Sequence, residues 1–138
     1  MTLYDRVTYD LGHFDLSEAD RNEIEHMFAK GEYMVCTDET ADSSARGQIL
    51  SMLWAFQPDF LAGETDLPAE VFSCLQEKLS ENCNNTILTL VCSTCGESAL
   101  VDSAVATDGR GHFLATYDSE EVKYTAKSGK TVYVYRVN

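Results

Sequence analysis

The chain has 138 residues, with 10 Lys and Arg against 23 Asp and Glu, which gives a formal net charge of −13 at pH 7. This acidity disfavours nucleic acid and anionic membrane as direct partners, and the 44% of hydrophobic residues excludes a disordered acidic tail. A chain of this length folds as one domain with a core that needs neither disulfides nor metal. We therefore expect a single soluble domain over residues 1–138, helical and acidic over 1–85 and β-rich over 86–138.

The first elements are a short strand or extended arm over residues 2–9 and then a helix. Ser17 is a suitable N-cap for this helix, and Asp20 follows three residues later in a capping-box arrangement. Gly31 fits the position just past the helix end. One side of the helix is acidic and carries Glu18, Asp20, Glu23 and Glu25.

The middle of the chain predicts two more helices. Residues 36–44 are rich in acids and hydroxyls and predict a polar loop. Ser43 or Ser44 then caps a second helix, which is apolar nearly all round and should be buried. Residues 57–67 form a connector, and Pro68 begins a third helix.

The last third of the chain reads as strands. β-branched and apolar residues predict a strand over 86–91, and 112–117 is a second candidate. Residues 99–106 fit a strand or a short helix, and 108–111 fit a turn. Strands over 122–126 and 131–137 should form a hairpin with one aliphatic and one aromatic face. The sequence therefore predicts an α+β fold, with about three helices packed on a mostly antiparallel sheet of three to five strands.

The cysteine content and the beginning of the chain favour a reducing compartment. Met1 is followed by Thr2, Leu3, Tyr4 and Asp5, without the basic and apolar regions of a signal peptide. The five cysteines are an odd number, and free thiols are the default interpretation. We therefore expect a cytoplasmic protein.

Cys92 and Cys95 are separated by two residues and followed by a glycine, a spacing that suits half of a zinc site. A structural zinc ion needs four ligands, and the remaining cysteines and histidines do not stand at a known spacing. Free, mostly buried thiols are the alternative, so no cofactor is expected beyond this zinc hypothesis. The same pair could also be redox-active.

Arg110 and His112 lie in the sequence Asp-Gly-Arg-Gly-His, which looks like an anion-binding loop. It lacks the spacing and the Lys-Ser/Thr ending of a P-loop. A simple turn is the alternative, but these two residues are the natural pair for a small anion.

The acidic residues themselves are the third candidate. Residues 1–42 hold eleven acids and three bases. If the acids gather on one face, they could imitate duplex DNA, which shows about one charge per 1.7 Å of axis. The alternative for these acids is an ordinary helix face exposed to solvent. A second group of acids, at 118–121, is interpreted as exposed to solvent or facing a partner. The candidate partner-binding residues are Asp15, Glu18, Asp20, Glu25, Asp38, Glu39 and Asp42.

The C-terminal segment carries a resemblance. Residues 109–114 (GRGHFL), then Tyr117, Asp118 and Glu120, then residues 133–138 (YVYRVN), resemble the ending of small uncharacterised proteins carried by phages, prophages and plasmids. The resemblance covers about the last 30 residues. It implies a mobile-element origin in a bacterial host cell, and such genes often encode inhibitors of host defence or host enzymes.

Three functions follow as hypotheses. The first is a small acidic interaction protein that inhibits a basic, nucleic-acid-handling host protein such as a defence nuclease, with nucleic-acid mimicry as its mechanism. The second is a small enzyme or anion-binding domain that uses Arg110 and His112. The third is a zinc-stabilised adaptor that uses Cys92 and Cys95. A non-enzymatic role is favoured, and a homodimer stays open.

Overall fold

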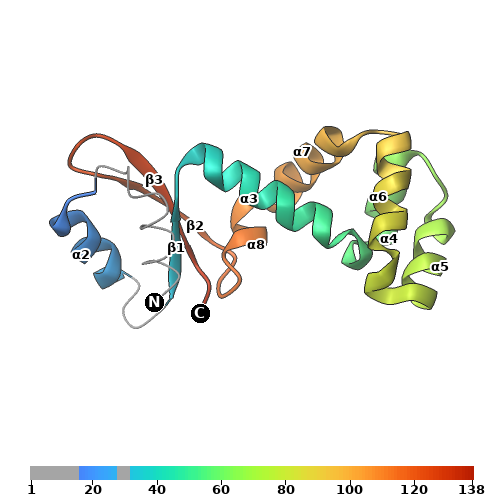
Figure 1. The fold of residues 1–138 in the computed structure, drawn as a ribbon, viewed down its shortest axis with the longest axis horizontal. Coiled ribbons are helices and arrows are strands. Elements are labelled where there is room, and N and C mark those ends of the chain that lie inside the picture. Colours follow the sequence, from blue (N-terminus) through green and yellow to red (C-terminus); the bar gives the residue numbers. More distant parts are fainter. Residues whose placement is uncertain (1–15, 28–31) are drawn as a thin grey trace. The chain divides into compact units, whose positions relative to one another are not determined.

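The computed structural model describes residues 16–27 and 32–138 (Figure 1). The helices and strands follow one another as α2 (Glu18–Met27), β1 (Tyr33–Cys36), α3 (Asp38–Ser51), the 3-10 turn η1 (Leu53–Ala55), α4 (Pro58–Thr65), α5 (Ala69–Leu79), the 3-10 turn η2 (Ser80–Cys83), α6 (Asn84–Ser93), α7 (Glu97–Asp108), α8 (Arg110–Leu114), β2 (Glu121–Thr125) and β3 (Thr131–Arg136). The chain divides into two units: Met1–Ala45 with Asp108–Asn138, and Arg46–Thr107. We call them the sheet unit and the helical unit.

The sheet unit is built on a three-stranded antiparallel sheet in the order β1-β3-β2. The C-terminal strand is therefore the central one, with Val134 opposite Val35 of β1 and Val122 of β2. The predicted hairpin is confirmed, because β2 and β3 are joined by a tight turn in which Gly129 has φ 93°. An α+β fold with an antiparallel sheet is thus what the chain adopts.

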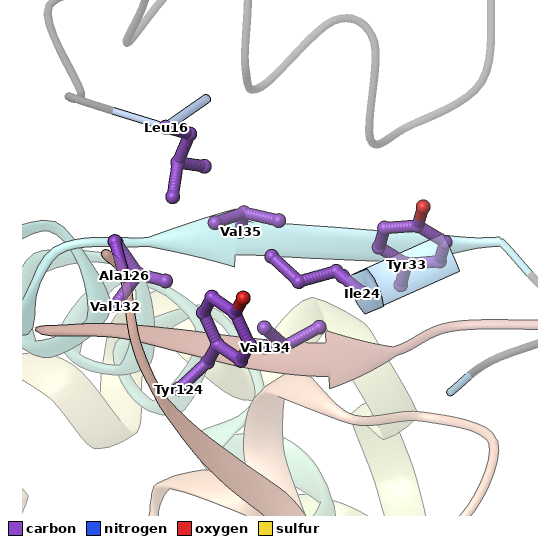
Figure 2. Close-up of a cluster of buried hydrophobic side chains, with 8 residues drawn as sticks. All are labelled: Leu16, Ile24, Tyr33, Val35, Tyr124, Ala126, Val132 and Val134. Carbon is purple, nitrogen blue, oxygen red and sulfur yellow. The ribbon is translucent and has the colours of Figure 1, made fainter. Parts of the chain in front are cut away.

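The period-two alternation of β3 gives the sheet two different buried faces. Val132 and Val134 point to one face, which is covered by α2 through Ile24 (Figure 2). Tyr133 and Tyr135 point to the opposite face, where side chains of α3 and α8 pack. The predicted alternation is therefore confirmed for β3, although Tyr124 of β2 and Tyr33 of β1 also pack on the valine face; helices lie on both sides of the sheet (Figure 1).

The helical unit contains η1, α4, α5, η2, α6 and most of α7. Pro58 occupies the first turn of α4, where its missing amide hydrogen costs nothing. Asn84 ties the unit together, since its side chain accepts a hydrogen bond from the backbone N of Trp54 and donates one to the carbonyl of Leu50. Ile49, Leu53, Phe72 and Ile87 are fully buried in this unit, whereas Leu79 is 43% exposed.

Several predicted elements are wrong. About three helices is an undercount, because the described residues also form α4, α6, α7 and α8. The predicted strand over 86–91 lies inside α6, and the strand over 112–117 is replaced by α8 and a turn. Helices thus continue to residue 114, so the expected β-rich half begins only at residue 121.

The predicted polar loop over 36–44 is also wrong. Cys36 ends β1, and α3 begins directly after it. The Thr37 hydroxyl accepts a hydrogen bond from the Thr40 amide at 3.2 Å, which caps the helix. Asp38 and Glu39 stand in the first turn, where negative charge favours a helix. The predicted arm over 2–9 and the helix end at Gly31 lie outside the described residues.

Within the described ranges, no single helix is long and apolar enough to cross a membrane. The segments Ala69–Ser93 and Glu97–Asp108 reach that length and composition only as a pair bent by 106°.

Candidate functional site

The sheet unit contains a partly buried arginine that binds three carboxylates. Arg110 begins α8, directly after Gly109, whose φ of 86° suits a residue without a side chain. The guanidinium carbon lies 4.7 Å from the centre of the Tyr133 ring. Only 11% of the Arg110 side chain is exposed, so its charge has to be balanced by nearby groups.

The guanidinium is shared between two elements far apart in the sequence. Its Nε and Nη2 donate to the two carboxylate oxygens of Glu121 on β2, at 2.9 and 3.1 Å. Its Nη1 donates to Asp38 Oδ1 at 2.7 Å and to Asp42 Oδ1 at 3.0 Å, both on α3. The same nitrogen lies 3.2 Å from the Asp38 carbonyl oxygen. Arg110 therefore joins the start of α3 to the edge strand β2.

The surrounding groups hold this arrangement in place. Burial alone would lower the pKa of Arg110, but the bonds to Glu121, Asp38 and Asp42 raise it well above its ordinary value. The Tyr135 hydroxyl donates to Glu121 Oε2 at 2.6 Å, and burial together with this bond raises the pKa of Tyr135. Arg110 thus remains charged and Tyr135 remains protonated across the physiological pH range.

Gly111 explains how α8 comes close enough to β2. A Cβ atom at this position would lie 2.7 Å from the carbonyl oxygen of Ser119 and 2.8 Å from the amide nitrogen of Glu121. Both are backbone atoms, so they cannot move aside as a flexible side chain would. The glycine therefore allows the close approach that brings the Arg110 side chain to Glu121.

Further carboxylates stand next in the chain to those that bind Arg110. Asp38 and Asp42 keep 67% of their side chains exposed although they bind the guanidinium. Glu39 is the next residue along α3 and is exposed, and Asp118 and Glu120 are exposed in the segment that leads into β2. We call the set formed by Asp38, Glu39, Asp42, Asp118, Glu120 and Glu121 the acidic surface. Three bases stand near these six carboxylates: Arg110, Lys123 on the same face of β2 as Glu121, and Arg136, whose guanidinium lies over the Tyr117 ring beside Asp118.

The structure brings together only part of the predicted partner-binding set. Asp38, Glu39 and Asp42 belong to the acidic surface, and an open hollow along α3 is lined by Glu39, Thr40, Ser43 and Ser44. Glu18 is exposed on α2, which covers the opposite face of the sheet. Asp15 and the side chain of Glu25 lie outside the described part of the chain. The exposed acids of this set that the structure describes are therefore split between two sides of the sheet.

The prediction that Asp20 lies on the surface is wrong. Asp20 is fully buried, and its carboxylate accepts hydrogen bonds from the Ser17 amide and hydroxyl, at 3.0 and 2.8 Å, and from the Tyr124 hydroxyl at 3.0 Å. The Lys127 amide donates to it at 3.2 Å. Burial acts to raise the pKa of Asp20, but these hydrogen bonds outweigh it and lower the pKa. The capping box at Ser17 is confirmed, and Asp20 is a structural residue.

The geometry does not favour anion binding at Arg110 and His112. All three guanidinium nitrogens of Arg110 already donate to carboxylates, so an anion would have to displace them. His112 is exposed on α8, and its ring stands perpendicular to that of Phe113, with 5.0 Å between the ring centres. The anion site stays a prediction that this arrangement does not support.

Cys92 and Cys95 lie at the end of α6 in the helical unit. The Cys92 thiol is exposed and donates to Glu97 Oε1 at 3.4 Å, and Cys95 is half-buried. The bond to Glu97 is the largest of several effects that raise the pKa of Cys92. Over residues 16–27 and 32–138, no group of three or more His, Cys, Asp and Glu side chains is arranged to hold a metal ion. Zinc at this pair stays a prediction.

Comparison with protein-family models, with curated proteins and with solved structures finds no match for this chain. The site is therefore described from its own residues. Sequence reasoning did not link Arg110 to the acids of α3 or to Glu121, and Tyr135 was recognised only as part of an aromatic face. No short-range pattern contains this link, because Arg110 lies 72 residues from Asp38 and 68 from Asp42 in the chain.

Proposed function

We propose that this chain is a small acidic interaction protein that binds a basic, nucleic-acid-handling protein through the acidic surface. The observation that carries the proposal is the position of Asp38 and Asp42. Both are fixed by one guanidinium nitrogen, yet each remains two-thirds exposed. Their second oxygens are free of the hydrogen bonds to Arg110 and are suited to accept bonds from lysine or arginine side chains of a partner.

Preorganisation is the physical advantage of this arrangement. Two oxygens bound to the same nitrogen lie within about 6 Å of one another, so the carboxylates stay close despite their repulsion. A flexible acidic loop would lose side-chain entropy when it binds, whereas these side chains are already held in place. Six carboxylates against three bases leave the surface negative, which steers a basic partner toward it.

Closely spaced, exposed carboxylates support imitation of nucleic-acid phosphates, because duplex DNA also carries a dense row of negative charges, about one per 1.7 Å of axis. A partner that binds DNA through Lys and Arg side chains would then be unable to bind DNA, because this chain would occupy the same surface. The more specific role, inhibition of a host defence protein by a mobile genetic element, rests on the resemblance of the C-terminal segment alone. It is the narrower form of the proposal and needs the partner to be identified.

The test compares two charge-reversal variants in a tagged pull-down from a bacterial lysate, washed at low and at high salt. The first variant, Glu39→Lys with Glu120→Lys, changes the acidic surface but neither of these side chains holds Arg110. The control, Glu77→Lys with Glu81→Lys, makes the same change in net charge on exposed positions of the helical unit. Circular dichroism confirms that both variants fold.

The proposal predicts one dominant basic partner, lost at high salt, that binds the wild-type chain and the control but not the surface variant. Equal loss in both variants would show that only total charge matters. Retention of the partner by the surface variant would contradict the proposed interface.

A further inference from the structure

The end of α6 places two accessible thiols on one turn of the chain. Cys92 lies in the last turn of the helix and is exposed, and Cys95 follows in the turn toward α7. Of the other cysteines, Cys36 and Cys83 are buried, and Cys74 is exposed on α5. Cys92 and Cys95 are therefore the only accessible cysteines so close in sequence.

The backbone between them is tightly wound. The carbonyl oxygen of Val91 accepts hydrogen bonds from the amide of Thr94 at 3.2 Å and from the amide of Gly96 at 2.8 Å. The Cys95 sulfur lies 3.9 Å from the same oxygen. Gly96, with φ 88°, allows the chain to leave the helix in this way. Both cysteines lie inside the turn that the hydrogen bond from Gly96 to Val91 closes, so their Cα atoms stay near one another, and a disulfide requires Cα atoms about 4.4–6.8 Å apart.

We propose that Cys92 and Cys95 form a reversible disulfide, so that this turn is a thiol-modification site with glutathione disulfide or a similar low-molecular-weight disulfide as its oxidant. One cysteine, as thiolate, attacks a sulfur of the oxidant and releases one glutathione. The sulfur of the second cysteine then displaces the other glutathione and closes the Cys92–Cys95 bond. The two thiols lose two protons and two electrons, and the oxidant becomes two molecules of glutathione.

The Cys92 thiol is hydrogen-bonded to Glu97, which forms an ion pair with Arg46. In the thiol state Cys92 donates to Glu97 Oε1, while Glu97 Oε2 binds Arg46 Nη2 at 2.7 Å. Arg46 also donates to the Ser98 hydroxyl at 3.3 Å. Disulfide formation removes the hydrogen that Cys92 donates, so Glu97 keeps only Arg46. The oxidised and reduced forms therefore differ in the hydrogen bond that joins the end of α6 to the start of α7, while the bonds from Arg46 of α3 remain.

The test uses the full chain carrying Cys74→Ser, reduced and treated with a chelator, then incubated with glutathione disulfide over a range of ratios to glutathione. Intact-mass analysis and peptide mapping follow the products. The proposal predicts a species lighter by two hydrogen atoms, with a bond between Cys92 and Cys95, that returns to the thiol form when glutathione is added. Amide hydrogen exchange at Thr94 and Gly96 should slow in that species.

The comparison variants are Cys92→Ser and Cys95→Ser, each of which leaves one thiol of the pair. Both should accumulate a glutathione adduct at oxidant ratios where the intact pair forms its disulfide. The proposal is overturned if the intact pair carries glutathione on each cysteine, or stays reduced while the exposed thiol of Cys74 in the wild-type chain is already modified.

Discussion

Replacing Arg110 with Met should lower the free energy of unfolding by about 3 kcal/mol. The main loss is the pair with Glu121, whose side chain is 29% exposed, because a hydrogen bond to a charged group contributes about 1.5–3 kcal/mol. Asp38 and Asp42 are 67% exposed, so each adds less than about 1 kcal/mol. Met keeps an apolar side chain of similar length but lacks the guanidinium that lies over the Tyr133 ring, so the substitution removes the charge together with its contact to that ring.

Urea unfolding followed by circular dichroism measures this change. The slope of the free energy against urea concentration should be the same in both proteins, which shows that unfolding exposes the same amount of surface. Arg46→Met is the matched control, since Arg46 and Glu97 are 42% and 34% exposed, and it should cost less than about 1 kcal/mol. The free energy of unfolding of Arg110→Lys should lie between those of the wild-type chain and Arg110→Met, because one ammonium cannot reach both Glu121 and α3. The reasoning would be refuted if Arg110→Met lowered the free energy of unfolding no more than the control does. It would also be refuted if the losses from Arg110→Met and Glu121→Gln simply added in the double variant.

Three further predictions concern stability and thiol reactivity. Asp20→Asn should lower the free energy of unfolding by about 1–3 kcal/mol at neutral pH. Because the folded pKa of Asp20 is lowered, this contribution is present above about pH 4 and is lost as the pH falls through the folded value, so urea unfolding of the two proteins should converge in acid. Gly111→Ala should cost about 1–3 kcal/mol through its backbone clash, whereas Gly47→Ala, with nothing within 4 Å of its added methyl group, should stabilise α3 by about 0.5–1 kcal/mol in the same measurement. Burial raises the pKa of Cys36 to about 11, so mass analysis after alkylation at about pH 8 should find Cys36 unmodified and Cys74 modified; labelling of Cys36 before unfolding would contradict its buried position.

The elements that the sequence predicted are those with strong local signals. The hairpin follows from alternation on both sides of Gly129, and the start of α2 follows from the capping box at Ser17. These signals depend only on neighbouring residues, so they are visible without the fold. The same chemistry was misread at Thr37, where a hydroxyl followed by acids begins α3 and does not form a loop.

The run of β-branched residues in α6 shows why other elements were missed. Ile87 and Val91 are four residues apart and both fully buried, which is a helical spacing. The residues between them are half-buried or exposed, and the tie from Asn84 to η1 anchors the start of the helix. Tertiary packing thus outweighs the β-propensity of the segment.

The sequence predicted some residues of the candidate site but not how they come together. Asp38, Glu39 and Asp42 were recognised as acids that face a partner, and Arg110 was recognised only as one of two residues suited to a small anion. Their convergence depends on strand pairing and on the close approach at Gly111, which are properties of the whole sheet unit. The acids of α2 could not be separated from those of α3 before the sheet between them was known.

The most direct test of the proposed function is the affinity of the purified partner for three proteins over a range of salt concentrations. These are the wild-type chain, the variant with Lys at Glu39 and Glu120, and the control with Lys at Glu77 and Glu81. We predict that the surface variant binds more weakly and with a shallower dependence on salt, while the control keeps the wild-type slope and most of the affinity. Identical affinity and slope for the surface variant and the wild-type chain would contradict binding through the acidic surface.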